Sequence, residues 1–293
     1  MLSFKFIQDK NLESKPLSPA LHIISTPIGN MDDISLRALN AIISVDFLYT
    51  EDPRVSLKLL NHFNIKRSLR TYNDQANDKV RTEIINLIKS GKSIGLISDA
   101  GTPLISDPGY KLTKDIEFNN LDIFALPGAC SPIAALTCSS MPTDNFSFLG
   151  FAPRKTAQLE SLFEKVKHIQ TPLIFFESAN RINNFLEVAA HKMPNQEIFI
   201  ARELSKKFEE KISTTTDKAR EIIADRTLKG ELVIIINNQL QKKTIAFAND
   251  LNKVIEIGNK YLSAKDLSKF LSEITNLKKN EIYNNILEKE KAV

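Results

Sequence analysis

The sequence predicts an α/β protein with two domains and a short helical C-terminal segment. Short apolar runs of four to six residues are typical of buried strands. Amphipathic stretches of helical length lie between these runs. A chain of 293 residues is also long enough for two domains. Strands that alternate with helices indicate a mainly parallel sheet, whose ligands bind beyond the carboxyl ends of the strands.

The first α/β domain is expected over residues 20–140, after an N-terminal extension of residues 1–19. Its strands are predicted at 21–24, 47–50, 93–97 and 122–126, and its helices at 34–44, 80–90 and 110–119. The turn-forming sequence Met141-Pro142-Thr143-Asp144 then interrupts the pattern.

The second α/β domain is expected over residues 144–238. Its strands are predicted near 146–149, 173–177, 197–202 and 231–236, and its helices at 158–168, 180–190 and 216–225. Residues 241–293 form a helical extension with helices at 249–257, 263–274 and 278–287. Ser263, followed three residues later by Asp266, gives the second of these helices an N-cap signal.

The composition excludes several classes of protein. Hydrophobic residues make up 42% and charged residues 25% of the chain, which is ordinary for a globular protein. No apolar run approaches the roughly 18 residues of a membrane span, and the first fifteen residues lack the apolar centre of a secretory signal. Cys130 and Cys138 make no disulfide framework or zinc motif. We therefore expect a cytoplasmic protein without a membrane segment or a metal.

Charge is distributed unevenly along the chain. The net charge is only +4, too small to imply a nucleic-acid partner. Residues 241–293 nevertheless hold ten lysines against seven acidic residues, so most of the excess lies in the helical extension. Two interpretations stay open, a solvated helical bundle and a segment that docks on RNA.

The loop over residues 97–109 is the strongest candidate for a ligand site. The chain has only nine glycines, so those that remain are the ones most needed. This loop holds two glycines, two prolines and two aspartates directly after a predicted strand. Proline restricts the backbone and glycine permits its close approach to a ligand. Such a loop suits a flat or polar ligand held by backbone groups.

Further candidate loops follow other predicted strands. Residues 25–33 form a strand-to-helix turn without the glycine spacing of the dinucleotide fingerprint. Residues 126–132 open a helix, with Ser131 as a possible N-cap and Pro132 at its first position. Residues 51–54, 175–181 and 201–204 place carboxylates beside arginines, which is also the pattern of a surface ion pair. The scattered histidines form no Ser/His/Asp arrangement.

The motifs of the chain, in their order, resemble the bacterial 16S ribosomal RNA cytidine 2′-O-methyltransferases of the tetrapyrrole methylase superfamily. The motifs that carry the resemblance are Ser25-Thr-Pro-Ile-Gly-Asn30, Glu51-Asp-Pro-Arg54, Ser98-Asp-Ala-Gly-Thr-Pro103, Ser106-Asp-Pro-Gly109, Leu126-Pro-Gly-Ala-Cys-Ser131, Gly150-Phe151, Phe176-Glu-Ser178 with Arg181, Ala201-Arg-Glu-Leu204 and Lys229-Gly-Glu231. The resemblance as a whole runs from about residue 21 to residue 236. One departure is Pro53, where the family usually has threonine.

The resemblance implies two α/β domains with S-adenosyl-L-methionine in the cleft between them. It also implies a homodimer that acts on 16S rRNA, within the small ribosomal subunit, at a cytidine ribose hydroxyl of the decoding centre. By position, it assigns cofactor binding to Pro27, Gly29, Asp99, Ala100, Gly101, Pro103, Ala129, Cys130, Ser131, Phe176, Arg202 and Glu203.

Removal of the hydroxyl proton can be assisted by a carboxylate within hydrogen-bond reach. Asp32, Glu51 and Glu177 are the candidates, because all three occupy loop positions that are expected to face the cleft. The sequence does not choose among them.

Two alternatives to ribose methylation differ in what they require of the sequence. Methylation of a tetrapyrrole carbon usually goes with a first loop of the form G-x-G-x-G-D, whereas this chain has Thr26-Pro-Ile-Gly-Asn-Met31. A non-catalytic, RNA-binding ribosome-assembly factor would have no use for the glycine-bearing loops.

Overall fold

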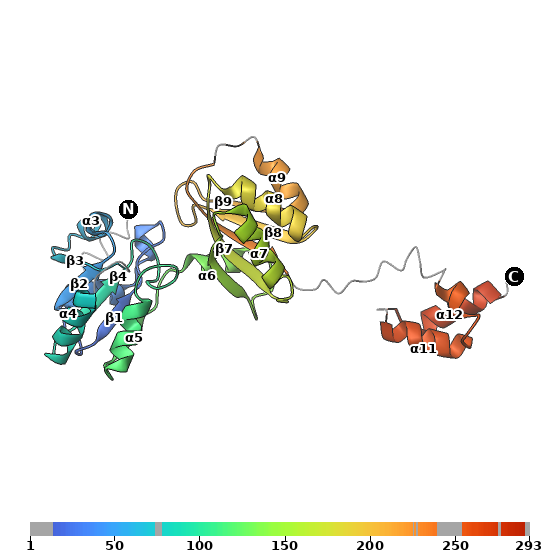
Figure 1. Ribbon diagram of the computed structural model, residues 1–293, viewed down its shortest axis with the longest axis horizontal. Coiled ribbons are helices and arrows are strands. Elements are labelled where there is room, and N and C mark those ends of the chain that lie inside the picture. Colours follow the sequence, from blue (N-terminus) through green and yellow to red (C-terminus); the bar gives the residue numbers. More distant parts are fainter. Residues whose placement is uncertain are drawn as a thin grey trace. The chain divides into compact units, whose positions relative to one another are not determined.

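Two five-stranded sheets organise the larger of two compact units, Met1–Asn237 and Asn238–Val293. The computed structural model describes residues 14–73, 78–224, 226, 228–238, 254–274 and 277–290. Figure 1 shows each sheet with its own helices, the first in blue to green and the second in yellow-green to orange.

The first sheet has the strand order β3-β2-β4-β1-β5, and all its strands are parallel. The strands are β1 (Leu21–Ile24), β2 (Phe47–Thr50), β3 (Leu69–Thr71), β4 (Ile94–Ile97) and β5 (Ile123–Leu126). Every residue of the central strand β4 is buried, as expected where helices cover both faces of a parallel sheet.

Helices pack on both faces of this sheet. One hydrophobic cluster joins α2 (Leu36–Ser44) and α3 (Pro53–His62) to one face through buried Leu39, Ile42 and Leu60. A second cluster joins α4 (Asp78–Lys89) and α5 (Tyr110–Phe118) to the other face through Ile84 and Leu112. Because the connections cross over the sheet in this way, the carboxyl ends of the strands meet at one edge.

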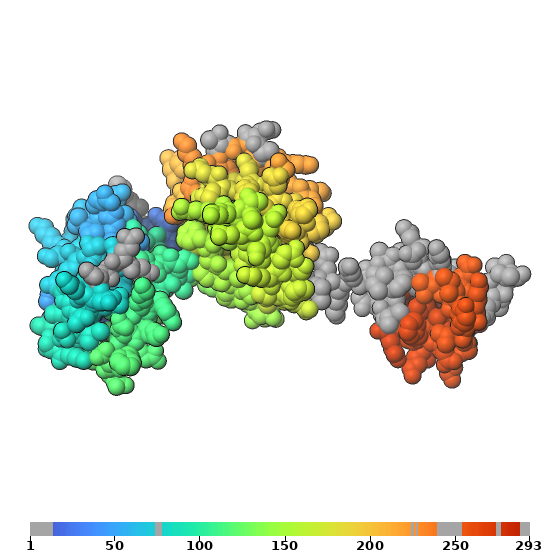
Figure 2. All heavy atoms as spheres, viewed as in Figure 1, coloured from blue at the N-terminus to red at the C-terminus, as the bar shows by residue number. Residues whose placement is uncertain are grey.

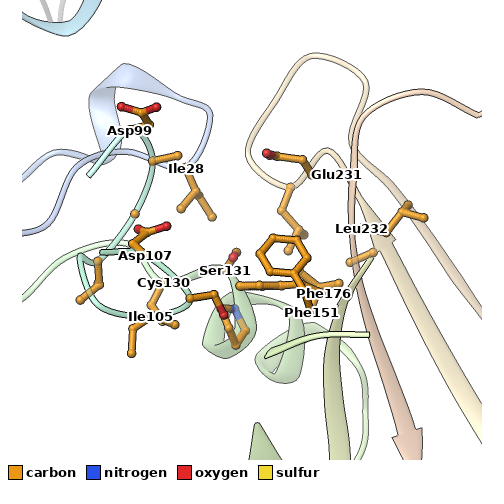
Figure 3. A pocket seen from close by; sticks show the side chains of 18 of the residues that line it. Ile28, Asp99, Ile105, Asp107, Cys130, Ser131, Phe151, Phe176, Glu231 and Leu232 are labelled. Atoms are coloured by element: carbon orange, nitrogen blue, oxygen red, sulfur yellow. The ribbon is translucent and has the colours of Figure 1, made fainter. Parts of the chain in front are cut away.

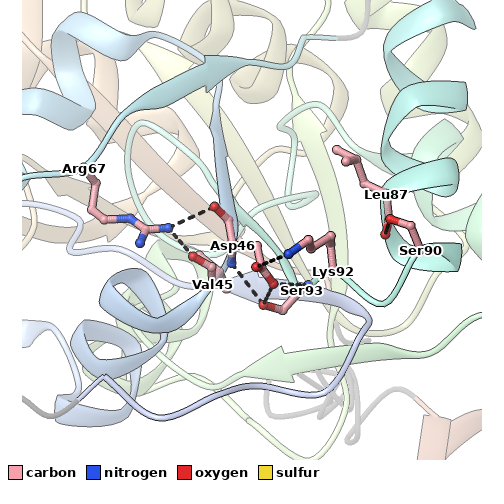
Figure 4. A network of polar contacts seen from close by, with 7 residues as sticks. All are labelled: Val45, Asp46, Arg67, Leu87, Ser90, Lys92 and Ser93. Carbon is pink, nitrogen blue, oxygen red and sulfur yellow. Dashed lines mark hydrogen bonds and ion pairs between the residues drawn. The ribbon is translucent and has the colours of Figure 1, made fainter.

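The opposite edge, at the amino ends of the strands, is held by polar contacts around Asp46 (Figure 4). The Asp46 carboxylate accepts hydrogen bonds from the Ser93 backbone N–H at 2.8 Å and the Ser93 hydroxyl at 2.9 Å. Lys92 Nζ lies 3.1 Å from the other carboxylate oxygen, and the Arg67 guanidinium donates to the Val45 carbonyl. These contacts tie the starts of β2 and β4 together.

The second sheet has the order β6-β7-β10-β8-β9. Its strands are β6 (Ser147–Phe151), β7 (Pro172–Ser178), β8 (Glu197–Arg202), β9 (Glu210–Thr215) and β10 (Glu231–Asn237). Only the β6–β7 pair is parallel among these pairs. One face is covered by α7 (Thr156–Val166), α8 (Ile182–Lys192) and α9 (Thr216–Ala224), through a core that includes Phe163, Phe175 and Phe185.

The helix α6 (Ser131–Cys138) packs on the other face of this second sheet. Ala135 and Leu136 of α6 share a buried cluster with Ile174, Phe199 and Ile235. The loop that begins α6 therefore leaves the last strand of the first sheet and enters the core of the second. Pro132 at the start of α6 leaves no backbone N–H unsatisfied there.

The smaller unit is helical in its described part, which is drawn in red in Figure 2. It contains a short helix at 254–258, α11 (Ala264–Ile274) and α12 (Lys279–Glu290), around buried Ile255, Leu267 and Ile286. The predicted cap of α11 is confirmed, since the Asp266 N–H donates to Ser263 Oγ at 3.2 Å. The rest of the helix expected at 249–257 lies outside the described residues.

The expected α/β architecture is confirmed, with three elements added. The expected parallel pairing holds for the first sheet but is wrong for the second, because β10 lies between β7 and β8 and runs antiparallel to both. The sequence reading missed α3, whose start is fixed by the Asp52 cap and Pro53, and the two edge strands β3 and β9. β3 has only three residues and β9 (Glu-Lys-Ile-Ser-Thr-Thr) is mainly polar, so neither contains the apolar run that marks a buried strand. The N-cap of α6 is Cys130 and not Ser131, one residue earlier than expected.

Candidate functional site

A pocket of about 280 Å³ lies where the carboxyl ends of the first sheet face the second sheet. Figure 3 shows Asp99, Ile28 and Asp107 on one wall, Glu231, Leu232 and Phe176 on the other, and Ser131 of α6 between them. The complete lining is Ile28, Glu51, Asp99, Ala100, Gly101, Thr102, Ile105, Ser106, Asp107, Cys130, Ser131, Pro132, Phe151, Phe176, Glu177, Ala201, Glu203, Leu204, Lys206, Glu231, Leu232 and Val233.

Hydrogen bonds join the loops that follow β1, β4 and β5. The Thr26 N–H donates to the Gly101 carbonyl at 2.8 Å, and the Gly101 N–H donates to the Pro27 carbonyl at 3.3 Å. Thr102 Oγ1 donates to the Ala129 carbonyl at 2.9 Å and lies 3.0 Å from Ser25 Oγ. The three loops therefore form one rigid wall, as their proline and glycine content predicts.

The loop after β2 joins the same wall through Asp99. The Asp52 backbone N–H donates to Asp99 Oδ1 at 3.1 Å. The Asp52 side chain instead caps α3 by accepting from the Arg54 N–H at 2.9 Å, and hydrogen bonds from Arg54 lower the pKa of this carboxyl to about 2. Pro53 stands at the first turn of α3, where proline is favoured.

The loop backbone adopts uncommon conformations beside the pocket. Gly101 has a φ of +83°, and the non-glycine residues Leu104 and Ser106 have φ values of +72° and +67°. Positive φ costs about 1 kcal/mol or more in residues with a β-carbon, and such residues cluster at functional sites. The chain also approaches itself closely here, since a β-carbon on Gly128 would lie 2.5 Å from Ser25 Cβ.

On the second-sheet wall, Glu177 is buried beside an arginine. Only 3% of Glu177 is exposed, yet its carboxylate lies 2.5 Å from Arg181 NH2 and accepts from the Ser178 N–H at 2.7 Å. Burial raises the pKa of this carboxyl, against the opposing effect of these two partners. The neighbouring Phe176 ring contacts the Phe151 ring with their centroids 5.2 Å apart, which makes this part of the wall aromatic.

Glu203 and Glu231 hold Lys206 at the top of the same wall. Lys206 Nζ lies 3.0 Å from Glu203 Oε1 and 3.2 Å from Glu231 Oε2. The Glu231 N–H also donates to Glu203 Oε1 at 3.1 Å. Gly230 has a φ of +98°, a conformation that favours glycine, and a β-carbon there would also displace the Glu203 carboxylate.

The pocket is strongly acidic. Glu51, Asp99 and Asp107 lie on the first wall, and Glu177, Glu203 and Glu231 on the second. Among the described residues that line it, Lys206 is the one basic residue. Burial is the main cause that raises the pKa of Asp99, and burial together with the charge of Glu51 raises the pKa of Asp107 to about 7. The site therefore favours a positively charged ligand.

The structure brings many of the sequence-predicted site residues to this pocket. Those on the wall are Glu51, Asp99, Ala100, Gly101, Cys130, Ser131, Phe176, Glu177 and Glu203. Pro27 and Ala129 lie behind it and accept the hydrogen bonds of the Gly101 N–H and the Thr102 hydroxyl, and Pro103 is buried in the loop.

Three predicted residues lie away from the pocket wall. Asp32 is exposed in the 3₁₀ turn η1 (Met31–Asp33). The Arg202 side chain donates to Glu210 Oε2 at 3.0 Å and to the Lys229 carbonyl at 3.2 Å. Gly29 faces the second-sheet loop, where a β-carbon would lie 2.5 Å from Lys206 Cγ. Gly29 therefore allows close contact between two loops.

Sequence reasoning did not select several residues of the wall. Asp107 lies within the loop already singled out, and its position as the second aspartate of that loop was the available signal. Ile28 and Glu231 belong to motifs that were recognised, but apolar and exposed acidic residues carry no chemical signal of their own. Lys206 and Leu232 could be placed only by the fold.

Comparisons with known proteins identify one family for this chain. Residues 20–220 match the model of the tetrapyrrole (corrin/porphyrin) methylases. A ribosomal RNA small subunit methyltransferase I of Rickettsia prowazekii is 44% identical over 86% of this chain and 89% of its own length. The protein of the same name from Vibrio cholerae is 36% identical over 91% and 93%. The chain belongs to the ribosomal RNA small subunit methyltransferase I family.

Solved structures agree with this family's fold. The cobalt-precorrin-4 methyltransferase of cobalamin biosynthesis superposes with a TM-score of 0.56 at 15% identity, over 75% of this chain and 95% of its own. A uroporphyrin-III C-methyltransferase from Thermus thermophilus, complexed with S-adenosyl homocysteine, gives 0.51 at 12% identity, over 74% and 96%. As a member of the family, this protein is a methyltransferase that uses S-adenosylmethionine.

The wall residues fit this cofactor. The acidic lining complements a sulfonium cation that also carries an ammonium group. Ile28, Phe151, Phe176 and Leu232 supply apolar surface for a flat adenine ring. The described residues contain no group of three His, Cys, Asp or Glu that could hold a metal ion. No helix among them is long and apolar enough to cross a membrane.

Proposed function

We propose that the protein transfers a methyl group from S-adenosylmethionine to the ribose 2′-hydroxyl of a cytidine in the decoding centre of 16S rRNA. The observation that carries this proposal is the acidic, loop-walled pocket at the carboxyl ends of the first sheet, in a chain that belongs to the small subunit methyltransferase I family. A ribosomal substrate also places the proposed activity in the cytoplasm.

The loops of the first sheet bind and orient both reactants in this proposal. S-adenosylmethionine supplies an electrophilic methyl carbon, and its transfer to an oxygen requires chiefly proximity and in-line alignment. The hydrogen bonds among Thr26, Gly101 and Thr102 fix the wall before ligands bind, so little ordering remains for the reaction itself. Carboxylates around the pocket stabilise positive charge on the methyl donor in the ground state and can accept the hydroxyl proton.

The first loop, with Ile28 on the pocket wall, favours this activity over methylation of a tetrapyrrole. The first loop places an isoleucine side chain on the pocket wall, at a point where the tetrapyrrole enzymes usually carry the flexible G-x-G-x-G-D sequence. The acidic pocket argues against a non-catalytic assembly factor, because a protein that only binds RNA requires no enclosed acidic site. Calorimetric titration with S-adenosylmethionine separates the two classes, since only the enzyme binds it.

The helical unit is proposed to assist docking on the small subunit. Lys278 and Lys279 are both exposed at the start of α12, and Lys260, Lys265 and Lys269 are also exposed. Lys242 and Lys243 lie outside the described residues. Phosphate contacts of this kind supply affinity that weakens with salt. We also propose a homodimer, which light scattering at micromolar protein would contradict by giving the mass of one 33 kDa chain.

The proposed function is tested by methylating small ribosomal subunits from cells that lack this protein. Purified enzyme and labelled S-adenosylmethionine should introduce one methyl group, which nuclease digestion and mass mapping should place on a cytidine ribose. A methyl group on a base, on a protein or on no component contradicts the proposal. The same assay with a chain that ends at Gln241 should show a KM raised about tenfold and a shallower salt dependence. An unchanged KM would contradict docking by the helical unit.

A further inference from the structure

Asp99 and Asp107 differ from the three glutamates of the second-sheet wall, each of which contacts a basic side chain. Glu177 contacts Arg181, Glu203 and Glu231 contact Lys206, and Asp99 accepts from the Asp52 N–H. The ion pairs found among the described residues include none to Asp107. The nearby Ser98 hydroxyl, which lowers the pKa of Asp107, donates to the Gly101 carbonyl at 3.0 Å. A carboxylate without a cation beside it keeps its electron pairs available for a proton.

The loop backbone aims this side chain into the pocket. Asp107 follows Ser106, whose φ of +67° turns the chain sharply, and precedes Pro108, which restricts it. In Figure 3 its carboxyl group lies between Asp99 and Cys130, across the pocket from Phe176. The strained turn thus presents a half-buried carboxylate to the pocket.

We propose that Asp107 is the general base that accepts the proton of the substrate hydroxyl. This inference rests on the proposed methyl transfer to a ribose. The hydroxyl oxygen forms a bond to the methyl carbon, and the carbon–sulfur bond of the donor breaks with its electron pair passing to sulfur. The hydroxyl proton moves to the Asp107 carboxylate and is later released to solvent, so the enzyme returns to its starting charge.

The surroundings of Asp107 give it the proton affinity that this step needs. Burial and the negative charges of Glu51, Asp99 and Glu231 raise the pKa of Asp107 to about 7, while the Ser98 hydroxyl opposes the rise. A general base works best when its pKa lies close to the working pH, because it is then both ionised and basic. An ordinary exposed aspartate, with a pKa near 4, would be a far weaker base.

Single-turnover methylation of small subunits between pH 6 and 9 tests the inference. For the wild type we expect a rate that rises with pH around a midpoint no higher than about 7, because the bound sulfonium cation favours the ionised Asp107 carboxylate. Asp107→Asn should lower the plateau roughly 10²- to 10³-fold and remove that rise. Its affinity for S-adenosylmethionine, measured by calorimetry, should change by no more than about threefold, which also shows that the variant folds.

Two further variants keep the outcome decisive. Asp107→Glu retains a carboxylate and should keep part of the rate and the rise with pH. Glu51→Gln should keep the rise but move its midpoint to lower pH, because removing a nearby negative charge lowers the pKa of Asp107.

An Asp107→Asn rate within about threefold of wild type with an unchanged midpoint would overturn the role of Asp107 alone. Loss of cofactor affinity in parallel with the rate would assign Asp107 to cofactor binding instead. A wild type that methylates no RNA would overturn the proposed function and this inference together.

Discussion

Asp46 and Asp107 lie at opposite edges of the first sheet, and their carboxyl pKa values are shifted in opposite directions. At the amino edge, hydrogen bonds from Ser93, assisted by Lys92, lower the pKa of Asp46. At the carboxyl edge, burial and neighbouring carboxylates raise the pKa of Asp107. The same residue type therefore stabilises the fold at one edge and stays chemically available at the other.

The two edges of the first sheet also differ in backbone conformation and crowding. The amino edge closes with ordinary capping and hydrogen bonds, such as the contact between the Asp46 N–H and Ser93 Oγ at 3.0 Å. Positive φ values at the amino edge fall on Asn64, Gly91 and Asn120, residue types that tolerate them. At the carboxyl edge they fall on Leu104 and Ser106, beside a crowded approach at Gly128. The contacts at the amino edge stabilise the fold, whereas the strained backbone at the carboxyl edge costs part of that stability and forms the pocket wall.

The largest effect should come from crowding at the carboxyl edge. Gly128→Ala would place a β-carbon 2.5 Å from Ser25 Cβ, so the loops after β1 and β5 must separate. We expect the free energy of unfolding, measured in urea, to fall by about 3 kcal/mol.

Gly91→Ala is the matched control at the amino edge. Gly91 has a φ of +87°, and no heavy atom of the described residues would lie within 4 Å of an added β-carbon. The cost should be that of the backbone conformation alone, about 1 kcal/mol. Equal losses for the two variants would show that the carboxyl edge is not the more crowded one.

The next-largest effect should be on the affinity for S-adenosylmethionine, without a change in folding stability. Ala100 is exposed on the pocket wall, and Ala125 is exposed on β5 away from it. Ala100→Phe should weaken binding of S-adenosylmethionine about 10- to 100-fold by filling the pocket, whereas Ala125→Phe should leave the affinity unchanged. Both variants should keep the melting temperature of the wild type, as differential scanning fluorimetry would show. A loss of affinity in both would contradict this location of the cofactor.

Gly101→Val, the substitution that the loop sequence alone suggests, is a poorer test of the same wall. Gly101 has a φ of +83°, and its β-carbon would lie 3.1 Å from Ile28 Cγ2. Any side chain is therefore strained there before a ligand arrives, and lost binding could reflect a displaced loop.

The strands and loops of this chain show which features could be predicted from the sequence and which could not. The buried strands were predictable because their apolar runs survive without distortion in β1, β2 and β8. Their order within each sheet was not predicted. The loop of Asp99 and Gly101 was predictable because glycine is scarce elsewhere. Which loop residues face the ligand was not, because it depends on φ values and on the crossing of α6 to the second sheet.

The carboxylates show the same limit more sharply. Sequence position selected Asp32, Glu51 and Glu177, and left Asp107 aside in the very loop that it had identified. Asp32 is exposed and Glu177 is engaged by Arg181, facts that follow from burial and pairing in three dimensions. A sequence shows where carboxylates occur along the chain, whereas their neighbours determine which of them can accept a proton.

Replacing Asp107 or Asp46 by asparagine should change the free energy of unfolding in opposite directions. The folded pKa of Asp107 lies above its unfolded value, so its contribution to stability is present below about pH 4 and is lost as the pH rises through 7. Asp107→Asn should therefore raise the free energy of unfolding at pH 8, by about 1–2 kcal/mol after allowance for the open pocket, and by much less at pH 5.

Asp46→Asn should lower the free energy of unfolding. The folded pKa of Asp46 lies below its unfolded value, so its contribution is present above about pH 4 and is lost only as the pH falls through the folded value. The variant should lose about 1–2 kcal/mol at both pH 8 and pH 5, because it weakens the hydrogen bonds from Ser93. Urea denaturation at the two pH values measures both variants, and shifts of the same sign would contradict the contrast between the edges.

The smallest effect asks which contact holds the amino edge. The Lys92–Asp46 ion pair is partly exposed, with 47% and 37% of the two side chains accessible, so Lys92→Gln should cost less than about 0.5 kcal/mol. Ser93→Ala removes a buried hydroxyl that donates to the Asp46 carboxylate and accepts from its N–H, and should cost about 1 kcal/mol. Raising NaCl to roughly 1 M should erase the first loss and leave the second, because salt screens exposed charges but not buried hydrogen bonds. A Lys92→Gln loss larger than that of Ser93→Ala would mean that charge pairing, and not the Ser93 hydrogen bonds, fixes the starts of β2 and β4.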